Sequence, residues 1–238
     1  MKQFIVTILL PIIFSSLNVY SQNNEFRFYK GEKNKYSSTE KSNLAFNKGN
    51  EYFDLGDYEN AVKQYSISIE EDKKQKYLST DTYLNRAKAL TQLNLFNDAI
   101  EDYSVVIENE TDETYIINAY IGRGGIYGFT NDFDKGIFDF EAVLKKKSKD
   151  VDALYNLSRL YIQRKEFNKG LDLLEKAEKE YHLQGLNIPI SISSILYMKG
   201  IAKYSLGNKD YCKEFLLAMN FKYSMVEDQI NFIKQVCY

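Results

Sequence analysis

The feature that most constrains this chain is a pair of small residues, twelve positions apart, that occurs five times. The interval within each pair is constant, whereas the intervals between successive pairs are 38, 37, 34 and 42 residues. This combination is typical of rigid helical hairpins joined by loops that tolerate insertions, and it predicts five hairpins. The pairs are Gly49 and Ala61, Ala87 and Ala99, Gly124 and Gly136, Ser158 and Gly170, and Gly200 and Cys212.

Large residues recur in phase with the small ones. Small residues let two antiparallel helices approach closely, and large residues fill the space between one hairpin and the next. We therefore expect an all-α fold with a core that is rich in aromatic side chains. The large residues lie three positions after the first small residue (Tyr52, Leu90, Tyr127, Tyr161), nine after it (Tyr58, Phe96, Phe133, Phe167) and sixteen after it (Tyr65, Tyr103, Phe140, Leu174, Leu216).

Each hairpin contains a short turn between its two helices. The turns begin at Gly56, Asn94, Asn131, Lys165 and Gly207. Gly and Asn tolerate the left-handed backbone that ends many helices, so Lys165 is the exception. The helices are expected near 41–54, 58–71, 80–93, 96–109, 114–129, 133–147, 151–164, 167–180, 190–205 and 208–220, with a last one near 225–237.

The segment from Lys48 to Ala61 resembles a tetratricopeptide repeat at almost every position. The resemblance covers roughly residues 42–220 and implies an α-solenoid of five such hairpins, which the last helix would cap. The fifth unit departs from the pattern, because Lys203 and Lys209 replace the expected aromatic residues and Cys212 replaces an alanine. The resemblance is specific for the fold and not for a ligand, since this family binds many unrelated partners.

The first 21 residues are typical of a secretory signal peptide. Lys2 supplies the positive start, and an apolar run follows that is about 14 residues long, short of the roughly 20 needed to span a membrane. Small residues end the segment at Ser21. We expect a signal peptide at 1–21, a polar and flexible leader at 22–41 and the solenoid at 42–238. The chain would then be exported, to the periplasm or outside the cell.

Charge and hydropathy exclude two classes of partner. Removing the first 21 residues changes the formal net charge from −2 to −3, and acidic and basic residues are interspersed, so nothing indicates a nucleic-acid surface. No second apolar stretch is long enough to span a membrane, so no stable membrane insertion is expected after cleavage. The partner expected is a protein or a peptide.

The two cysteines are expected to form a disulfide. Cys212 lies near the start of the last hairpin's second helix, and Cys237 lies at the end of the capping helix, which should run antiparallel to it. In an exported protein, two cysteines so placed are paired more often than free. Metal binding and redox catalysis are the alternatives, but there is no Cys-x-x-Cys pair, and the only histidine, His182, is not at ligand spacing.

No arrangement of residues predicts an enzyme, a metal site or a cofactor. The abundant acidic residues, such as Asp72 and Asp102, are interpreted as solvated helix surfaces. The glycine-rich run from Gly122 to Gly128 lacks the preceding strand and the Lys-Ser ending of a phosphate-binding loop. Its glycines each cost about 1 kcal/mol relative to alanine in a helix. They are explained either by drift or by a flat stretch that a ligand backbone can approach.

The resemblance implies that first helices line a concave surface, where extended peptides are commonly held. Amides there suit a peptide backbone, and aromatic rings suit its side chains. The predicted groove residues are Phe46, Asn50, Phe53, Asn85, Lys88, Gln92, Asn118, Ile121, Gly125, Phe129, Tyr155, Asn156, Arg159, Gln163, Tyr197 and Tyr204.

One subfamily binds a terminal carboxylate with two asparagines and three basic residues. Asn50 and Asn85 match its asparagines, but Phe46, Asn118 and Gly122 stand where its basic residues would be, so this mode is not expected. The leading hypothesis is an exported scaffold that holds an extended segment of a partner protein. The alternatives are a structural subunit of a cell-envelope assembly and a helical repeat protein that binds a small molecule or glycan.

Overall fold

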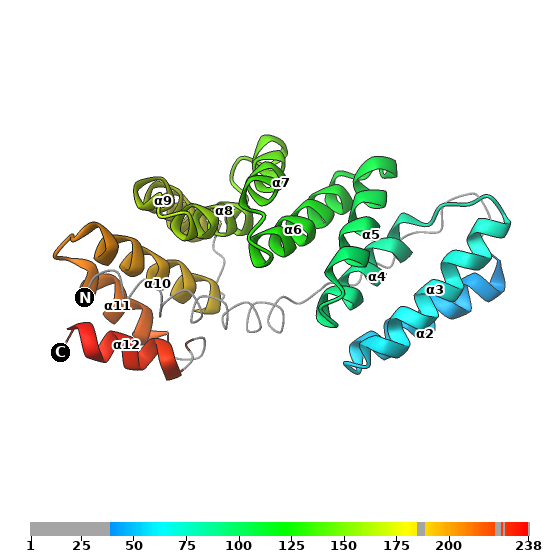
Figure 1. Ribbon diagram of the computed structural model, residues 1–238, viewed down its shortest axis with the longest axis horizontal. Helices are drawn as coiled ribbons and strands as arrows, with labels where there is room; N and C mark the ends of the chain where they lie inside the picture. The colour runs from blue at the N-terminus through cyan, green and yellow to red at the C-terminus, as the bar shows by residue number, and fades with distance from the viewer. Residues whose placement is uncertain (1–38, 185–188, 222–224, 226, 238) are drawn as a thin grey trace. The chain divides into compact units, whose positions relative to one another are not determined.

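The structure is a computed structural model that describes residues 39–184, 189–221, 225 and 227–237 (Figure 1). This part of the chain contains helices and connecting turns, and no strand. The predicted signal peptide and nearly all of the predicted leader lie outside the described residues. The helices are α2 (Glu40–Asp54), α3 (Tyr58–Lys74), α4 (Thr80–Gln92), α5 (Phe96–Asn109), α6 (Glu113–Phe129), α7 (Phe133–Lys146), α8 (Val151–Gln163), α9 (Phe167–Leu183), α10 (Pro189–Leu206), α11 (Tyr211–Asn220) and α12 (Glu227–Cys237).

The described helices belong to two compact units. The amino-terminal unit contains α2 to α6 and ends at Thr130, and the carboxyl-terminal unit contains α7 to α12 and begins at Asn131. Within each unit, every helix packs against the next one along the chain (Figure 1). The described chain is therefore all-α and built of consecutive antiparallel helices, as the repeat predicts.

All five predicted turns begin with a left-handed residue, including the one that starts at Lys165. The φ angle of Lys165 is 63°, inside the range of the others. The Glu166 N–H donates to the Tyr161 carbonyl at 2.8 Å, which is the hydrogen bond of a Schellman helix end. The left-handed residues of the other four predicted turns are Gly56 (76°), Asn94 (58°), Asn131 (63°) and Gly207 (74°), and Lys76, after α3, is also left-handed (54°).

The small residues allow close helix contact where the spacing predicts it. A Cβ added to Gly170 would lie 2.6 Å from Ile162 Cγ1 and 3.1 Å from the Ser158 carbonyl oxygen. A Cβ on Gly49 would lie 2.5 Å from the Tyr65 ring. Both glycines are therefore required by packing. Fully or almost fully buried at the corresponding positions are Ala61, Ala87, Ala99, Tyr65, Tyr103, Phe140 and Leu174.

The fifth hairpin differs from the prediction. Helix α11 begins at Tyr211, three residues later than expected, because residues 208–210 extend the turn. Leu216, the expected core residue, is 38% exposed, whereas its neighbour Phe215 is completely buried. A Cβ on Gly200 would lie 2.4 Å from the Phe215 ring. The helix is thus one residue out of phase with the other units, and the interval from Gly200 to Cys212 does not mark a small-residue contact.

Ion pairs occupy the place of the missing aromatic residue in this hairpin. Lys203 Nζ lies 2.9 Å from Asp210 Oδ2 and 2.7 Å from Glu214 Oε1. One turn earlier on α10, Lys199 Nζ lies 2.5 Å from Glu178 Oε2 and 3.5 Å from Glu214 Oε1. Glu214 is buried, and it therefore takes part in a charged network that joins α10 to α9 and α11.

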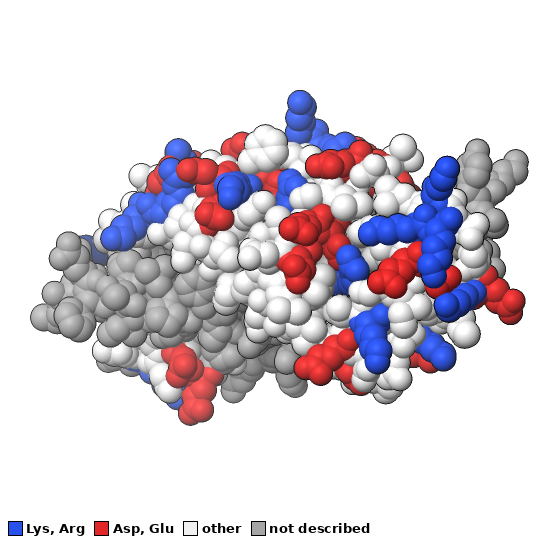
Figure 2. Space-filling model, turned by 45° about the vertical axis from the view of Figure 1, so that its right-hand side comes forward, with Lys and Arg blue, Asp and Glu red and all other residues white. Residues whose placement is uncertain are grey.

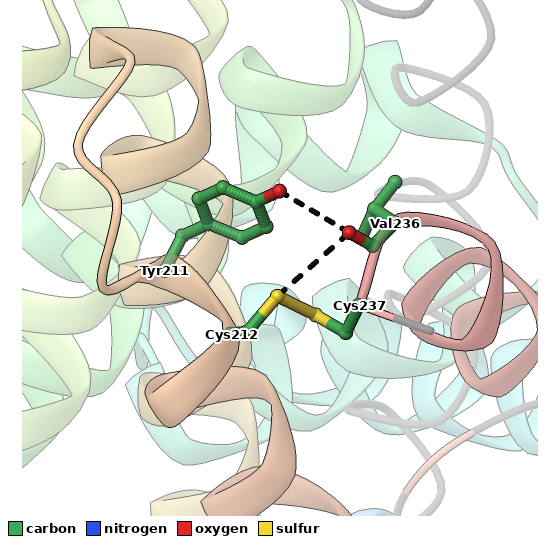
Figure 3. Close-up of a disulfide and its surroundings, with 4 residues drawn as sticks. All are labelled: Tyr211, Cys212, Val236 and Cys237. Atoms are coloured by element: carbon green, nitrogen blue, oxygen red, sulfur yellow. Dashed lines mark hydrogen bonds between the residues drawn. A yellow bond between two sulfur atoms is a disulfide. The ribbon is translucent and has the colours of Figure 1, made fainter.

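Helix α12 covers the end of the carboxyl-terminal unit. Phe232 and Ile233 pack into the same core cluster as Phe215. Cys237 is joined to Cys212 by a disulfide, and beside it the Tyr211 hydroxyl donates to the Val236 carbonyl at 3.1 Å (Figure 3). The helix begins at Glu227, slightly later than predicted.

The surface carries both signs of charge. Lysine and arginine side chains alternate with aspartate and glutamate over the face shown in Figure 2, as the sequence predicts. None of the described helices has the length and apolar character needed to cross a bilayer.

Candidate functional site

The side chains predicted to line the groove form a cluster in each unit. The asparagine cluster consists of Asn50 on α2, Tyr65 on α3 and Asn85 on α4. The arginine cluster consists of Tyr155, Asn156, Arg159 and Gln163 on α8, with Tyr197 on α10. A single groove that runs through both units stays a prediction.

The asparagine cluster is ordered by one shared acceptor. Asn50 Oδ1 accepts hydrogen bonds from the Tyr65 hydroxyl at 2.8 Å and from Asn85 Nδ2 at 3.3 Å. These bonds fix the orientation of both amides. Within the described residues, Asn50 Nδ2 and Asn85 Oδ1 have no hydrogen-bond partner. The pair thus offers one donor and one acceptor, the complement of a peptide group.

Tyr65 is the residue that sequence reasoning missed. Its spacing predicted a core position, and its ring is indeed completely buried, but its hydroxyl orients Asn50. Burial raises the pKa of Tyr65, with the Asp54 carboxylate adding to the rise. The hydroxyl therefore keeps its proton and remains a donor at physiological pH. A core tyrosine in place of phenylalanine was the only sequence signal for this role.

Other predicted residues surround the asparagine cluster. The Phe46 ring lies 6.0 Å from the Tyr65 ring. Phe53 is buried and packs edge-on against Tyr58 at 5.2 Å, so it belongs to the core and not to a ligand surface. Lys88 is 7% exposed, and burial lowers the pKa of its ammonium to about 8.

The glycine-rich run on α6 has two different explanations. A Cβ on Gly122 would lie 2.4 Å from Tyr103 Cζ, so this glycine is required by the Tyr103 ring and offers no flat surface to a ligand. A Cβ on Gly125 would meet nothing within 4 Å. Of these two glycines, Gly125 is the one that is open to an approaching backbone. On the same helix, Phe129 is 40% exposed, and its ring lies 4.9 Å from the Phe96 ring in a tilted arrangement. Asn118, Ile121 and Gln92 are partly buried.

The arginine cluster is held together by Arg159. Its Nη1 donates to Asn156 Oδ1 at 3.0 Å, and its Cζ lies 5.8 Å from the centre of the Tyr155 ring. Tyr155 in turn lies near Tyr197, and both rings are part of the core of the unit. Burial raises the pKa of Tyr197, with Tyr155 adding to the rise, so the hydroxyl stays protonated.

Three polar atoms of the arginine cluster are buried without a hydrogen bond. They are Arg159 Nε, Gln163 Oε1 and the Tyr197 hydroxyl oxygen. Buried polar groups are nearly always paired in folded proteins, and an unpaired one costs about 1 to 3 kcal/mol. The three atoms belong to residues of α8 and α10, and each has the capacity for a further hydrogen bond. Tyr204, the other predicted residue of α10, instead packs on Tyr211 and Phe232, against the cap.

Two acidic residues interpreted as solvated are in fact buried. Asp102 is 3% exposed, and Arg86 binds it through Nε and Nη2 at 2.7 Å each. Asp72 is 1% exposed. The surface interpretation was wrong for both, because the sequence does not show which neighbouring helix covers a side chain. Among the described residues, no three His, Cys, Asp or Glu side chains are grouped closely enough to hold a metal ion.

Repeated antiparallel hairpins with left-handed turns define the class of helical repeat proteins. The Tetratricopeptide repeat model matches residues 46–113. Solved structures of tetratricopeptide-repeat proteins share the fold of the described chain. A comparison with curated proteins gives no match.

Three solved structures illustrate the likeness. MamA 41-end from Desulfovibrio magneticus RS-1 has a TM-score of 0.66 and 16% identity, over 78% of this chain and 97% of that chain. YrrB, described as a TPR protein with an unusual peptide-binding site, has a TM-score of 0.60 and 10% identity, over 85% and 94%. TTC0263, a thermophilic TPR protein in Thermus thermophilus, has a TM-score of 0.57 and 12% identity, over 82% and 97%. At these identities the likeness concerns the fold.

Proposed function

We propose that this chain is an exported scaffold that holds an extended segment of a partner protein. The observation that carries the proposal is the asparagine cluster, in which the Tyr65 hydroxyl orients Asn50 so that the Asn50–Asn85 pair presents one donor and one acceptor. A peptide group needs that pair of bonds and offers it in any sequence. The similar YrrB structure, which is described as having a peptide-binding site, supports this kind of ligand.

Position 125 allows the proposal to be tested without disturbing the fold. Added side-chain atoms there meet nothing within 4 Å, and replacing a helical glycine also removes its conformational cost. We would place the photoreactive residue p-benzoylphenylalanine at Gly125 and irradiate the protein in a cell-envelope extract. Mass spectrometry then identifies the segment that is cross-linked. The matched control has the same residue at Asn97, which is exposed on α5.

Two further variants connect the cross-link to the asparagine cluster. Replacing Asn50 and Asn85 together by leucine keeps side-chain size and removes both amides, so the yield at position 125 should fall about tenfold, the effect of losing one to two hydrogen bonds. Circular dichroism checks that the helices are intact. A yield that stays the same in the double variant, or that is equal at positions 125 and 97, would refute the proposed site.

Export is the second part of the proposal. The apolar segment before Ser21 supports it, and so does the disulfide between Cys212 and Cys237, because such bonds persist in oxidising compartments. The intact mass of the protein from the native cell distinguishes an exported chain from one that keeps its first 21 residues. A chain that begins at Gln22 and lacks two hydrogens at its cysteines is expected. A full-length chain with two free thiols would exclude export by this route.

A further inference from the structure

The arginine cluster contains a buried positive charge that has no carboxylate beside it. Arg159 is 6% exposed, and no described residue forms an ion pair with it. Its two contacts are neutral, the Asn156 amide and the Tyr155 ring. An arginine keeps its charge at any physiological pH, and a buried charge is normally paired. The site is therefore electrostatically suited to an anion.

The unpaired atoms indicate which hydrogen-bonding groups the ligand must have. Arg159 Nε and the Tyr197 hydroxyl can both donate, and Gln163 Oε1 can only accept. A carboxylate has two oxygens and accepts both donated bonds. An N–H near that carboxylate would satisfy Gln163. An acidic side chain within a peptide supplies both groups, whereas a free inorganic anion lacks the N–H.

We infer that the arginine cluster binds the carboxylate of an aspartate or glutamate side chain in the segment that the scaffold holds. This inference rests on the proposed function, because it names the chemistry of one residue of that segment. The stacking of Arg159 on Tyr155 and its bond to Asn156 hold the guanidinium in place before the ligand arrives. Arg159, Gln163 and Tyr197 all lie in the carboxyl-terminal unit, so this subsite is complete without the asparagine cluster.

The test uses the full chain and a set of capped tripeptides, so that it does not require the natural partner. The first is acetyl-Ala-Glu-Ala-amide, and the second has Gln in place of Glu, which removes only the charge. The third is acetyl-Ala-Ala-Ala with a free carboxyl terminus. The readout is the nuclear magnetic resonance signal of the Arg159 Nε–H group, which is assigned by its absence in Arg159→Lys.

We expect the Glu peptide to shift this signal and to bind about five- to tenfold more tightly than the Gln peptide, because hydrogen bonds to a charged acceptor are roughly twice as strong. Arg159→Gln should abolish the difference. Arg164→Gln is the control, since Arg164 is exposed and already paired with Asp134 and Glu166. The wild-type comparison stands even if the Arg159 variants fold poorly.

Equal affinity for the Glu and Gln peptides would overturn the inference, as would a tighter interaction with the free carboxyl terminus than with the Glu side chain. These outcomes are distinguishable from failure of the proposed function. Loss of the cross-link at position 125 concerns the other unit, and a Glu-specific shift at Arg159 does not depend on it.

Discussion

Arg86 on α4 binds Asp102 on α5 through two hydrogen bonds of 2.7 Å, and its remaining amino group donates to Ser66 on α3 at 3.0 Å. One guanidinium therefore joins three consecutive helices of the amino-terminal unit. Asp102 is 3% exposed with the arginine in place, so removing the guanidinium leaves a largely buried carboxylate without its ion-pair partner.

We expect Arg86→Ala to lower the free energy of unfolding by about 3 to 5 kcal/mol, since it leaves a buried carboxylate unpaired. Urea unfolding followed by circular dichroism measures the change. Arg164→Ala is the matched control, because its partner Asp134 is 93% exposed and such pairs contribute at most about 1 kcal/mol. Equal losses in the two variants would show that Arg86 does not stabilise through Asp102.

Lys165 is held in a left-handed conformation, with a φ angle of 63°. A side chain in this region costs about 1 to 2 kcal/mol, and glycine avoids that cost. Lys165→Gly should therefore raise the free energy of unfolding by about 1 kcal/mol, part of the gain being offset by the greater freedom of glycine in the unfolded chain. Lys165→Ala keeps the strain and should show no gain. If glycine and alanine are equal, the turn is not strained.

Asp72 should make stability depend on pH. Both of its carboxylate oxygens are buried. Burial raises the pKa of Asp72 and the Asp81 carboxylate adds to the rise, and together they outweigh the Ser42 hydroxyl, which lowers it. The folded chain then keeps the proton to a higher pH than the unfolded chain does. The resulting stability is complete below the unfolded pKa, about 4, and is lost as the pH rises through the folded pKa.

Asp72→Asn keeps the shape and cannot ionise. We expect it to be about 1 to 3 kcal/mol more stable than the parent at pH 7 and to lose this advantage near pH 4. Urea unfolding at both pH values measures the difference. Glu70→Gln, an exposed acid on the same helix, is the control. If the stability advantage of Asp72→Asn did not depend on pH, the raised pKa of Asp72 would be contradicted.

The disulfide should stabilise the cap and nothing far from it. The two cysteines are 25 residues apart, and closing such a loop contributes about 3.5 kcal/mol in the chain-entropy model. Replacing both by serine should accelerate hydrogen exchange in α12 and α11, while α2 and α3 exchange as before. Mass spectrometry of peptides from the exchanged protein locates the effect. Unchanged exchange in α12 would mean that packing by Phe232 and Ile233 is sufficient.

The helices and turns could be predicted because they depend on local sequence. Helix α6, for example, begins one residue before its predicted start and ends where predicted. The fifth hairpin could not be predicted by the same rule. Its core residue is Phe215 and not Leu216, and the choice depends on how the turn at residues 208–210 leads into α11. A constant spacing identifies the repeat without showing where one unit deviates from it.

The candidate site was predictable only in part. Asn50, Asn85 and Arg159 were predicted as groove residues, because the resemblance places first helices along a concave surface. Whether a side chain faces a ligand or the core depends on neighbours from other helices. Phe53 is buried in the core for that reason, and the hydroxyl of Tyr65 acts on Asn50 from a different helix. Sequence alone gives the position along a helix and not the contact across it.

The contact between Gly122 and Tyr103 has a consequence for how this protein can change in evolution. The Tyr103 ring occupies the space in which any side chain at position 122 would begin. A mutation at either position alone is therefore restricted, whereas an alanine at 122 together with a smaller residue at 103 fills the same volume. Aligned sequences of close relatives should show the two positions varying jointly, with a larger residue at 122 only where 103 is no longer aromatic.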